Sequence, residues 1–237
     1  ATTRPPTPTP TPLPTATPQG TPVPDSSGNV VLTLGASKDN TLYEHEFGLM
    51  SNGAGAHIFA GNTRNSESRR ALIAFDIAGA LPAGAQVQSV SLALFMSQTT
   101  ALDEPVSLHR VLADWREGLT DAMANEGGGG AAQGDDATWT HAFKDVTPWE
   151  TPGGDFESSA SASTVVRERG STAVWESAGM VEDVQSWLDN PQGNFGWLLK
   201  GNEDDQRTAK RFDSRQHFDE PQRPVLTVAF TFDEALY

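Results

Sequence analysis

Residues 69–77, RRALIAFDI, decide the fold of this chain. Two arginines open the stretch, an apolar run follows, and an acid closes it. After a Gly/Pro turn at residues 80–84, the run VQSVSLALF at residues 87–95 alternates between apolar and small residues. A period of two is typical of a strand with one buried face, and it directs Val90, Leu92 and Leu94 to one side and Ser89, Ser91 and Ala93 to the other. We therefore expect two consecutive core strands, with the rest of the chain packed around them.

Further strands and one helix are expected along the chain. Apolar or alternating runs predict short strands at residues 29–34, 39–44, 57–61, 105–112, 137–141, 146–149, 161–166, 172–175, 195–199, 209–213 and 224–230. Ser177 is a good N-cap for a helix that Asn190-Pro191 stops, with apolar residues at helical spacing: Met180, Val181, Val184, Trp187 and Leu188. This pattern predicts an all-β, jelly-roll-type β-sandwich with one short α-helix, as a single domain over residues 25–237.

Residues 1–24 differ from the rest of the chain. Nine of the 16 prolines lie here, alternating with threonine, which excludes helix and sheet and favours an extended or polyproline II tail. Such tracts are stiff spacers, and their threonines are candidate O-glycan sites. We expect this tail to dock on a neighbouring subunit through Thr7, Pro8, Thr9 and Pro10. The next strand either pairs within its own domain or completes a neighbour's sheet through Val30, Val31, Leu32 and Leu34.

The composition excludes several classes of function. A net charge of −15 and a pI of about 4.6 argue against nucleic-acid binding, which needs clustered Lys and Arg. The absence of cysteine excludes disulfides and thiolate metal sites, and no apolar run is long enough to span a membrane. The chain begins at Ala1 rather than Met, as a secreted or cell-surface protein does after loss of its signal peptide.

Several stretches resemble one family of secreted β-sandwiches, the DNRLRE-domain family, which overlaps a carbohydrate-binding-module family. The resemblance is carried by Asp39-Asn40-Thr41-Leu42, by residues 70–76 and 81–87, by residues 111–115 with Glu117, and by residues 210–215 and 223–228. The family's usual Val-Thr-Trp is displaced by a glycine-rich loop, and Ala137-Thr138-Trp139 is its equivalent here. The resemblance implies a non-catalytic domain that binds glycans or builds an extracellular assembly.

Three sets of candidate site residues follow from the residues themselves. Trp139 and Trp149 border the long glycine-rich loop, so they either form a platform for sugar rings or pack beneath the loop. Asp39, Asn40 and Asp76 are oxygen donors near strand ends, which suits either a structural calcium or turns and ion pairs. Arginines and acids that flank the strands predict structural ion pairs that tie strand ends together, with Arg70, Asp76, Arg211 and Asp213 as their members.

No catalytic arrangement is recognisable in the sequence, and no cofactor other than calcium is expected. The acidic pairs Glu44/Glu46 and Asp135/Asp136 lack a partner motif, and the five histidines show no metal-ligand spacing. We therefore expect a non-enzymatic extracellular protein, the subunit of a self-assembling cell-surface polymer. The alternative is a carbohydrate-binding module, with a polysaccharide partner, on a Thr/Pro linker.

Overall fold

The structure is a computed structural model, which describes residues 23–24 and 29–232. Its strands are β1 (Val23–Pro24), β2 (Val30–Gly35), β3 (Lys38–Tyr43), β4 (Met50–Ser51), β5 (His57–Asn62), β6 (Ser68–Ala74), β7 (Gln86–Thr99), β8 (Glu104–Arg110), β9 (Gly130–Ala131), β10 (His141–Phe143), β11 (Thr147–Pro148), β12 (Ala162–Val166), β13 (Ser171–Glu176), β14 (Trp197–Lys200), β15 (Lys210–Asp213) and β16 (Val225–Thr231). The helices are α1 (Ile77–Ala80) and α2 (Ala178–Asp189), with 3-10 turns η1 (Met123–Asn125), η2 (Pro191–Gly193) and η3 (Glu220–Gln222). The predicted strand over residues 137–141 is wrong for residues 137–140, because β10 begins at His141.

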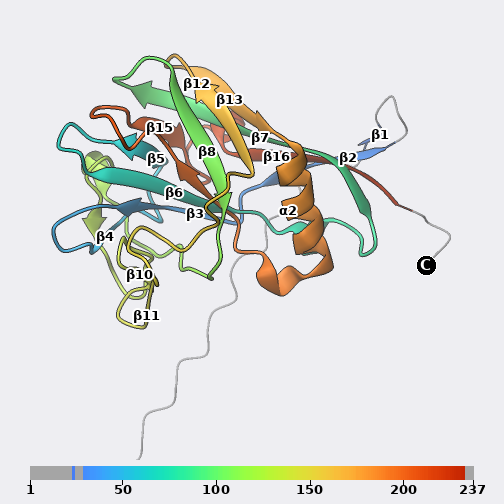
Figure 1. Cartoon of the computed structure of the whole chain (residues 1–237), viewed down its shortest axis with the longest axis horizontal. Helices are drawn as coiled ribbons and strands as arrows, with labels where there is room; N and C mark the ends of the chain where they lie inside the picture. Colours follow the sequence, from blue (N-terminus) through green and yellow to red (C-terminus); the bar gives the residue numbers. More distant parts are fainter. Residues whose placement is uncertain (1–22, 25–28, 233–237) are drawn as a thin grey trace, which may run out of the picture.

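The main sheet is antiparallel and curls into two layers, which confirms the predicted all-β sandwich with a short helix (Figure 1). One layer is built on β7, which pairs with β13, β15 and β16, and β16 pairs in turn with β2. The other layer is built on β6, which pairs with β3 and β14, and continues through β8 to β12. Strand β5 joins the two layers, because His57–Ala60 pair with β15 while Gly61 and Asn62 pair with β6.

The deciding stretch forms β6, and it is buried on both faces. Ala71, Ile73 and Phe75 point into the main core between the layers, while Leu72 and Ala74 point into a second apolar cluster. This second cluster lies under the segment that follows β8, and it also contains Leu42, Val111, Trp115, Ala137, Ala142, Trp149 and Leu198. Burial on both sides explains why the run is continuously apolar rather than alternating.

Strand β7 follows the predicted alternation, with Val90, Leu92 and Leu94 buried in the main core. It does not pair with β6, because the turn between them carries the chain from one layer to the other. The two runs therefore face each other across the core.

Helix α2 packs against β7 and covers one side of the sandwich (Figure 1). The hydroxyl of Ser177 accepts the N–H of Met180 at 3.0 Å, which confirms the predicted N-cap. Trp187 and Trp197 are fully buried, as their spacing predicts, with ring centroids 4.6 Å apart. The Asp183 carboxylate holds the helix in place by accepting the Trp197 Nε1–H at 2.7 Å. None of the helices in the described part of the chain is long and apolar enough to cross a membrane.

Strand β2 pairs with β16 of its own chain over Val30–Gly35, so Val30, Val31, Leu32 and Leu34 complete their own sheet. On its other side, β1 pairs only with Val30 and Val31. The predicted docking residues Thr7, Pro8, Thr9 and Pro10 lie outside the described residues.

Candidate functional site

A pocket of about 530 Å³ lies at the end of the sandwich where β5, β15 and β7 run side by side. Its floor is a row of cross-strand neighbours, in which Arg211 on β15 lies between Phe59 on β5 and Gln98 on β7. The pocket is lined by His57, Phe59, Thr63, Arg69, Gln98, Thr99, Thr100, Met123, Ala124, Glu126, Gly127, Ala209 and Arg211. Its volume is in the range of small-molecule sites.

The turn at residues 122–127 forms one wall of the pocket. Three side chains hold this turn against the sheet. Tyr43 donates its hydroxyl to the Glu126 carbonyl at 2.7 Å, Asn52 accepts the N–H of Ala122 at 2.8 Å, and Arg69 donates Nε–H to the Gly127 carbonyl at 3.1 Å. The wall is therefore fixed by buried groups of the sandwich.

The two arginines that line the pocket, Arg69 and Arg211, differ in burial and in how many of their N–H groups are hydrogen-bonded. The Arg69 guanidinium is buried, and each of its three nitrogens donates a hydrogen bond, to the carbonyls of Glu44, Ser68 and Gly127 and to the carboxylate of Glu67. Arg211 is half-buried and donates Nε–H to the Ser97 hydroxyl at 3.0 Å. Its two terminal amino groups have no hydrogen-bond partner in the described part of the chain. Burial lowers the pKa of Arg211, opposed by the charges of Asp213 and Glu126, but a guanidinium still stays charged at neutral pH.

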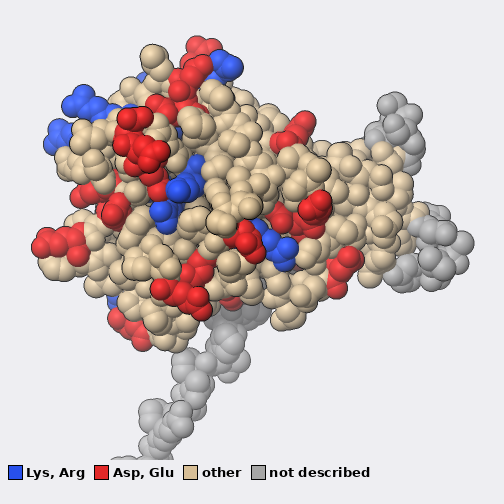
Figure 2. All heavy atoms as spheres, viewed as in Figure 1, with Lys and Arg blue, Asp and Glu red and all other residues tan. Residues whose placement is uncertain are grey.

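The free guanidinium belongs to a chain that is acidic overall. Figure 2 shows Asp and Glu side chains spread over the visible face, in keeping with the net charge of −15. An anionic ligand is therefore repelled at long range, and its binding depends on short-range donors such as Arg211.

Beside the pocket, two histidines and an aspartate come together. His57 on β5 and Asp213 on β15 are cross-strand neighbours, and His217 follows four residues after Asp213. His57 Nε2 lies 3.6 Å from Asp213 Oδ1, and His217 Nδ1 lies 3.5 Å from Asp213 Oδ2. Sheet pairing thus brings together two histidines that show no metal-ligand spacing along the sequence. The local spacing Asp213-x-x-x-His217 was the only signal of it in the sequence.

Glu126 connects this cluster with the pocket. Its Oε2 lies 3.0 Å from His57 Nδ1, on the opposite side of the imidazole ring from Asp213, and also accepts from Asn52 Nδ2 at 3.2 Å. Burial opposes ionisation of Glu126, but its contacts with His57 and Asn52 outweigh burial and lower its pKa. An ionised Glu126 favours the His57 tautomer that carries its proton on Nδ1.

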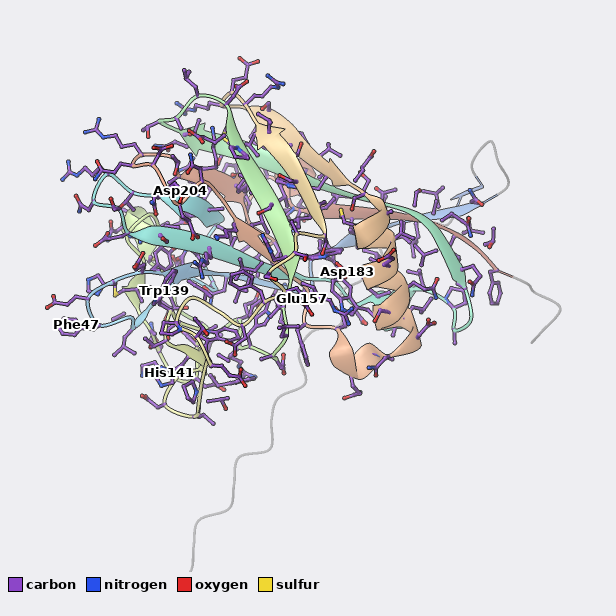
Figure 3. All side chains as sticks on the ribbon, in the orientation of Figure 1. Phe47, Trp139, His141, Glu157, Asp183 and Asp204 are labelled. Atoms are coloured by element: carbon purple, nitrogen blue, oxygen red, sulfur yellow. The ribbon has the colours of Figure 1, made fainter. Side chains whose placement is uncertain are left out.

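Of the two alternatives for Trp139 and Trp149, packing beneath the loop describes the structure better than a platform for sugar rings. Trp149 is only 4% exposed and donates Nε1–H to the Thr138 carbonyl, so it packs beneath the loop. Trp139 is half-buried, and the Arg70 guanidinium lies 4.9 Å from its ring centroid. Figure 3 shows Trp139 and His141 in the segment that carries β10 and β11. Apolar packing and a cation–π contact thus explain both rings.

The four residues predicted to form ion pairs at strand ends have different roles. Arg70 does form an ion pair, with Glu203, through two hydrogen bonds of 2.8 and 2.9 Å. The Asp76 carboxylate instead caps α1 by accepting the N–H of Gly79. Arg211 and Asp213 share no ion pair in the described residues, because alternate residues of β15 point to the same face but lie one pleat apart.

The predicted calcium ligands do not assemble. The Asn40 side-chain oxygen accepts the N–H groups of Thr41 and Asn52, and Asp76 is occupied by α1. Asp39 is buried, and burial together with the charge of Glu117 raises its pKa to about 8, despite the backbone N–H of Arg215 at 2.7 Å.

No protein-family model matches the chain, and a search of curated proteins finds no match. The resemblance to the DNRLRE-domain family therefore stays a prediction.

Proposed function

We propose that this chain is a secreted or cell-surface, non-enzymatic module that binds a saccharide carrying a carboxylate in the pocket on β5, β15 and β7. The observation that carries the proposal is the unpaired end of the Arg211 guanidinium on the pocket floor. A guanidinium fork matches a carboxylate with two parallel hydrogen bonds, and it also donates to neighbouring sugar hydroxyls.

The remaining pocket residues support a sugar as the ligand. Gln98, Thr99 and Thr100 are polar side chains at the end of β7, and Gln98 and Thr100 are exposed. They supply donors and acceptors for hydroxyl groups, while Met123, which is 72% exposed, supplies an apolar surface for a ring face.

Binding is favoured over hydrolysis by the carboxylates of the pocket. Most glycosidases place two carboxylic acids on either side of the scissile bond. Among the described residues that line this pocket, Glu126 is the only acid, and its carboxylate is held by His57 and Asn52.

Calorimetric titration with uronate oligosaccharides tests the proposal. The full chain should bind them, and Arg211→Gln should weaken binding by about 10- to 100-fold, as expected for the loss of a charged, two-pronged contact. Arg64→Gln removes the same charge from an exposed position and should leave binding unchanged. Equal binding by wild type and Arg211→Gln, or equal binding of neutral oligosaccharides of the same length, would refute the proposal.

A second candidate function is self-assembly into a polymer, which the outer edge of β2 favours. In the described part of the chain, no strand pairs with Leu32–Gly35 on the side away from β16. An unpaired edge is a template for a strand from another subunit. Removing residues 1–22 leaves β1 and β2 in place, and should abolish polymers seen by electron microscopy; unchanged polymers would exclude the tail as the docking segment.

A further inference from the structure

We propose that His57, Asp213 and His217 bind a divalent transition-metal ion of the zinc class, beside the pocket and independently of what the pocket binds. The two imidazole nitrogens and a carboxylate oxygen that face one another all lie within 4.8 Å. They come from two neighbouring strands and the turn that follows β15, so the sheet itself sets their spacing.

The distances suit metal ligands better than hydrogen bonds. The two nitrogen–oxygen separations, 3.6 and 3.5 Å, exceed the usual range for a hydrogen bond. In a tetrahedral zinc site with bonds of about 2.0–2.1 Å, neighbouring ligand atoms lie about 3.3 Å apart. Each ring nitrogen therefore lies near the separation that a shared cation requires, one beside each oxygen of the Asp213 carboxylate.

Asp213 supplies the second, independent observation. Its side chain is completely buried, and neither carboxylate oxygen has a hydrogen-bond partner in the described part of the chain. Buried carboxylates are normally paired or bound to a metal, because an uncompensated charge is costly in a low-dielectric interior. A divalent cation bound by this carboxylate and by the two imidazoles would compensate the charge.

The surroundings of the histidines favour the ligand state of both rings. Glu126 accepts from His57 Nδ1, which leaves the Nε2 lone pair facing Asp213. This is the carboxylate–histidine–metal arrangement of many metal sites. His217 Nδ1 lies 3.3 Å from the backbone N–H of Asp219 and 3.5 Å from its carbonyl oxygen, and a cation on Nδ1 would replace these two long contacts.

The donor set selects the class of cation. Imidazole nitrogens with one carboxylate suit zinc and its transition-metal neighbours, whereas calcium and magnesium prefer oxygen ligands alone. The side chains of His57 and His217 are 15% and 6% exposed, so the ion is enclosed and water completes its coordination. Through His57 and Glu126, a bound ion would also fix the wall of the pocket at residues 122–127.

The test is calorimetric titration of the chelator-treated full chain with ZnCl₂, together with visible absorption after addition of CoCl₂. Wild type should bind one equivalent of zinc and give the strong cobalt bands of a four-coordinate site. His57→Gln and His217→Gln should each weaken zinc binding by at least about 100-fold, and Glu126→Gln by about 10- to 100-fold. His45→Gln removes an exposed histidine outside the cluster and should bind as wild type does.

Two results would overturn the proposal. One is the absence of stoichiometric zinc or cobalt binding by wild type, which would show that the histidines serve Asp213 only as hydrogen-bond or ion-pair partners. The other is undiminished binding by both His57→Gln and His217→Gln, with circular dichroism spectra that match wild type. Neither result depends on saccharide binding, so this test is separate from that of the pocket.

Discussion

Asp39 should make this protein less stable as the pH rises, and Asp39→Asn should remove that sensitivity. The Asp39 side chain is 1% exposed, and Oδ1 has no hydrogen-bond partner in the described part of the chain. Burial is the main cause that raises its pKa to about 8, with a further contribution from Glu117. The carboxyl group is therefore protonated in the folded protein at pH 7 and ionised in the unfolded chain.

The direction and size of this change in stability follow from the pKa of Asp39 in the folded protein, about 8, and in the unfolded chain, about 4. The folded state binds more protons than the unfolded state between about pH 4 and pH 8, so the free energy of unfolding falls as pH rises through that window. The stability that protonated Asp39 contributes is fully present below about pH 4 and is lost above about pH 8. Between pH 5 and the folded pKa there are about three pH units, which correspond to a loss of about 4 kcal/mol. A domain of this size has about 5–15 kcal/mol of stability, so the effect is measurable.

Urea unfolding of wild type and Asp39→Asn at pH 5 and pH 9 is the assay. The stability of Asp39→Asn relative to wild type should increase by about 4 kcal/mol between these two pH values. Asp204→Asn changes an exposed aspartate and should follow wild type at both. A difference that stays constant with pH, or that changes in favour of wild type at pH 9, would show that Asp39 is ionised and paired with Arg215 in the folded protein.

Two further predictions concern stability at neutral pH. Ser177→Ala removes the hydroxyl that accepts from the Met180 N–H and donates to the Ser161 carbonyl, and it should cost about 1 kcal/mol in urea unfolding. Ser177→Thr keeps a hydroxyl and should retain most of this stability; equal stability of all three proteins would contradict this role. Glu203→Gln leaves the Arg70 guanidinium without its carboxylate partner and should lower the free energy of unfolding by about 1–3 kcal/mol. Glu150→Gln, at an exposed position, should leave it unchanged. An unchanged free energy of unfolding in Glu203→Gln would show that solvent replaces the ion pair without loss.

The strands and the helix could largely be predicted from sequence, because their signals are local. The alternation in residues 87–95 and the spacing of Met180, Val184 and Trp187 each reflect one buried face. The layer to which each strand belongs was not predictable in the same way, since it depends on pairing between distant segments. The continuous apolar run of β6 reported burial but not the second cluster under its other face.

The candidate site was predicted only in fragments. Arg211 and Asp213 were recognised as charged residues beside a strand, but the groups they contact were not predictable, because the pairing of β15 with β5 and β7 decides which side chains lie next to them. The residues that flank His57 and Glu126 in the sequence give no indication that these two side chains belong to a site. The tryptophans at 139 and 149 were conspicuous beside a glycine-rich loop, yet that loop covers an apolar cluster that buries Trp149.

An amide NMR titration with a uronate oligosaccharide tests the proposed pocket most directly. Binding through Arg211 predicts chemical-shift changes at residues 57–63, 97–100, 122–127 and 209–211, and predicts that Arg211→Gln abolishes them at the same ligand concentration. Shift changes confined to residues 137–156, or a set of changes that Arg211→Gln leaves intact, would contradict the assignment of this pocket as the binding site.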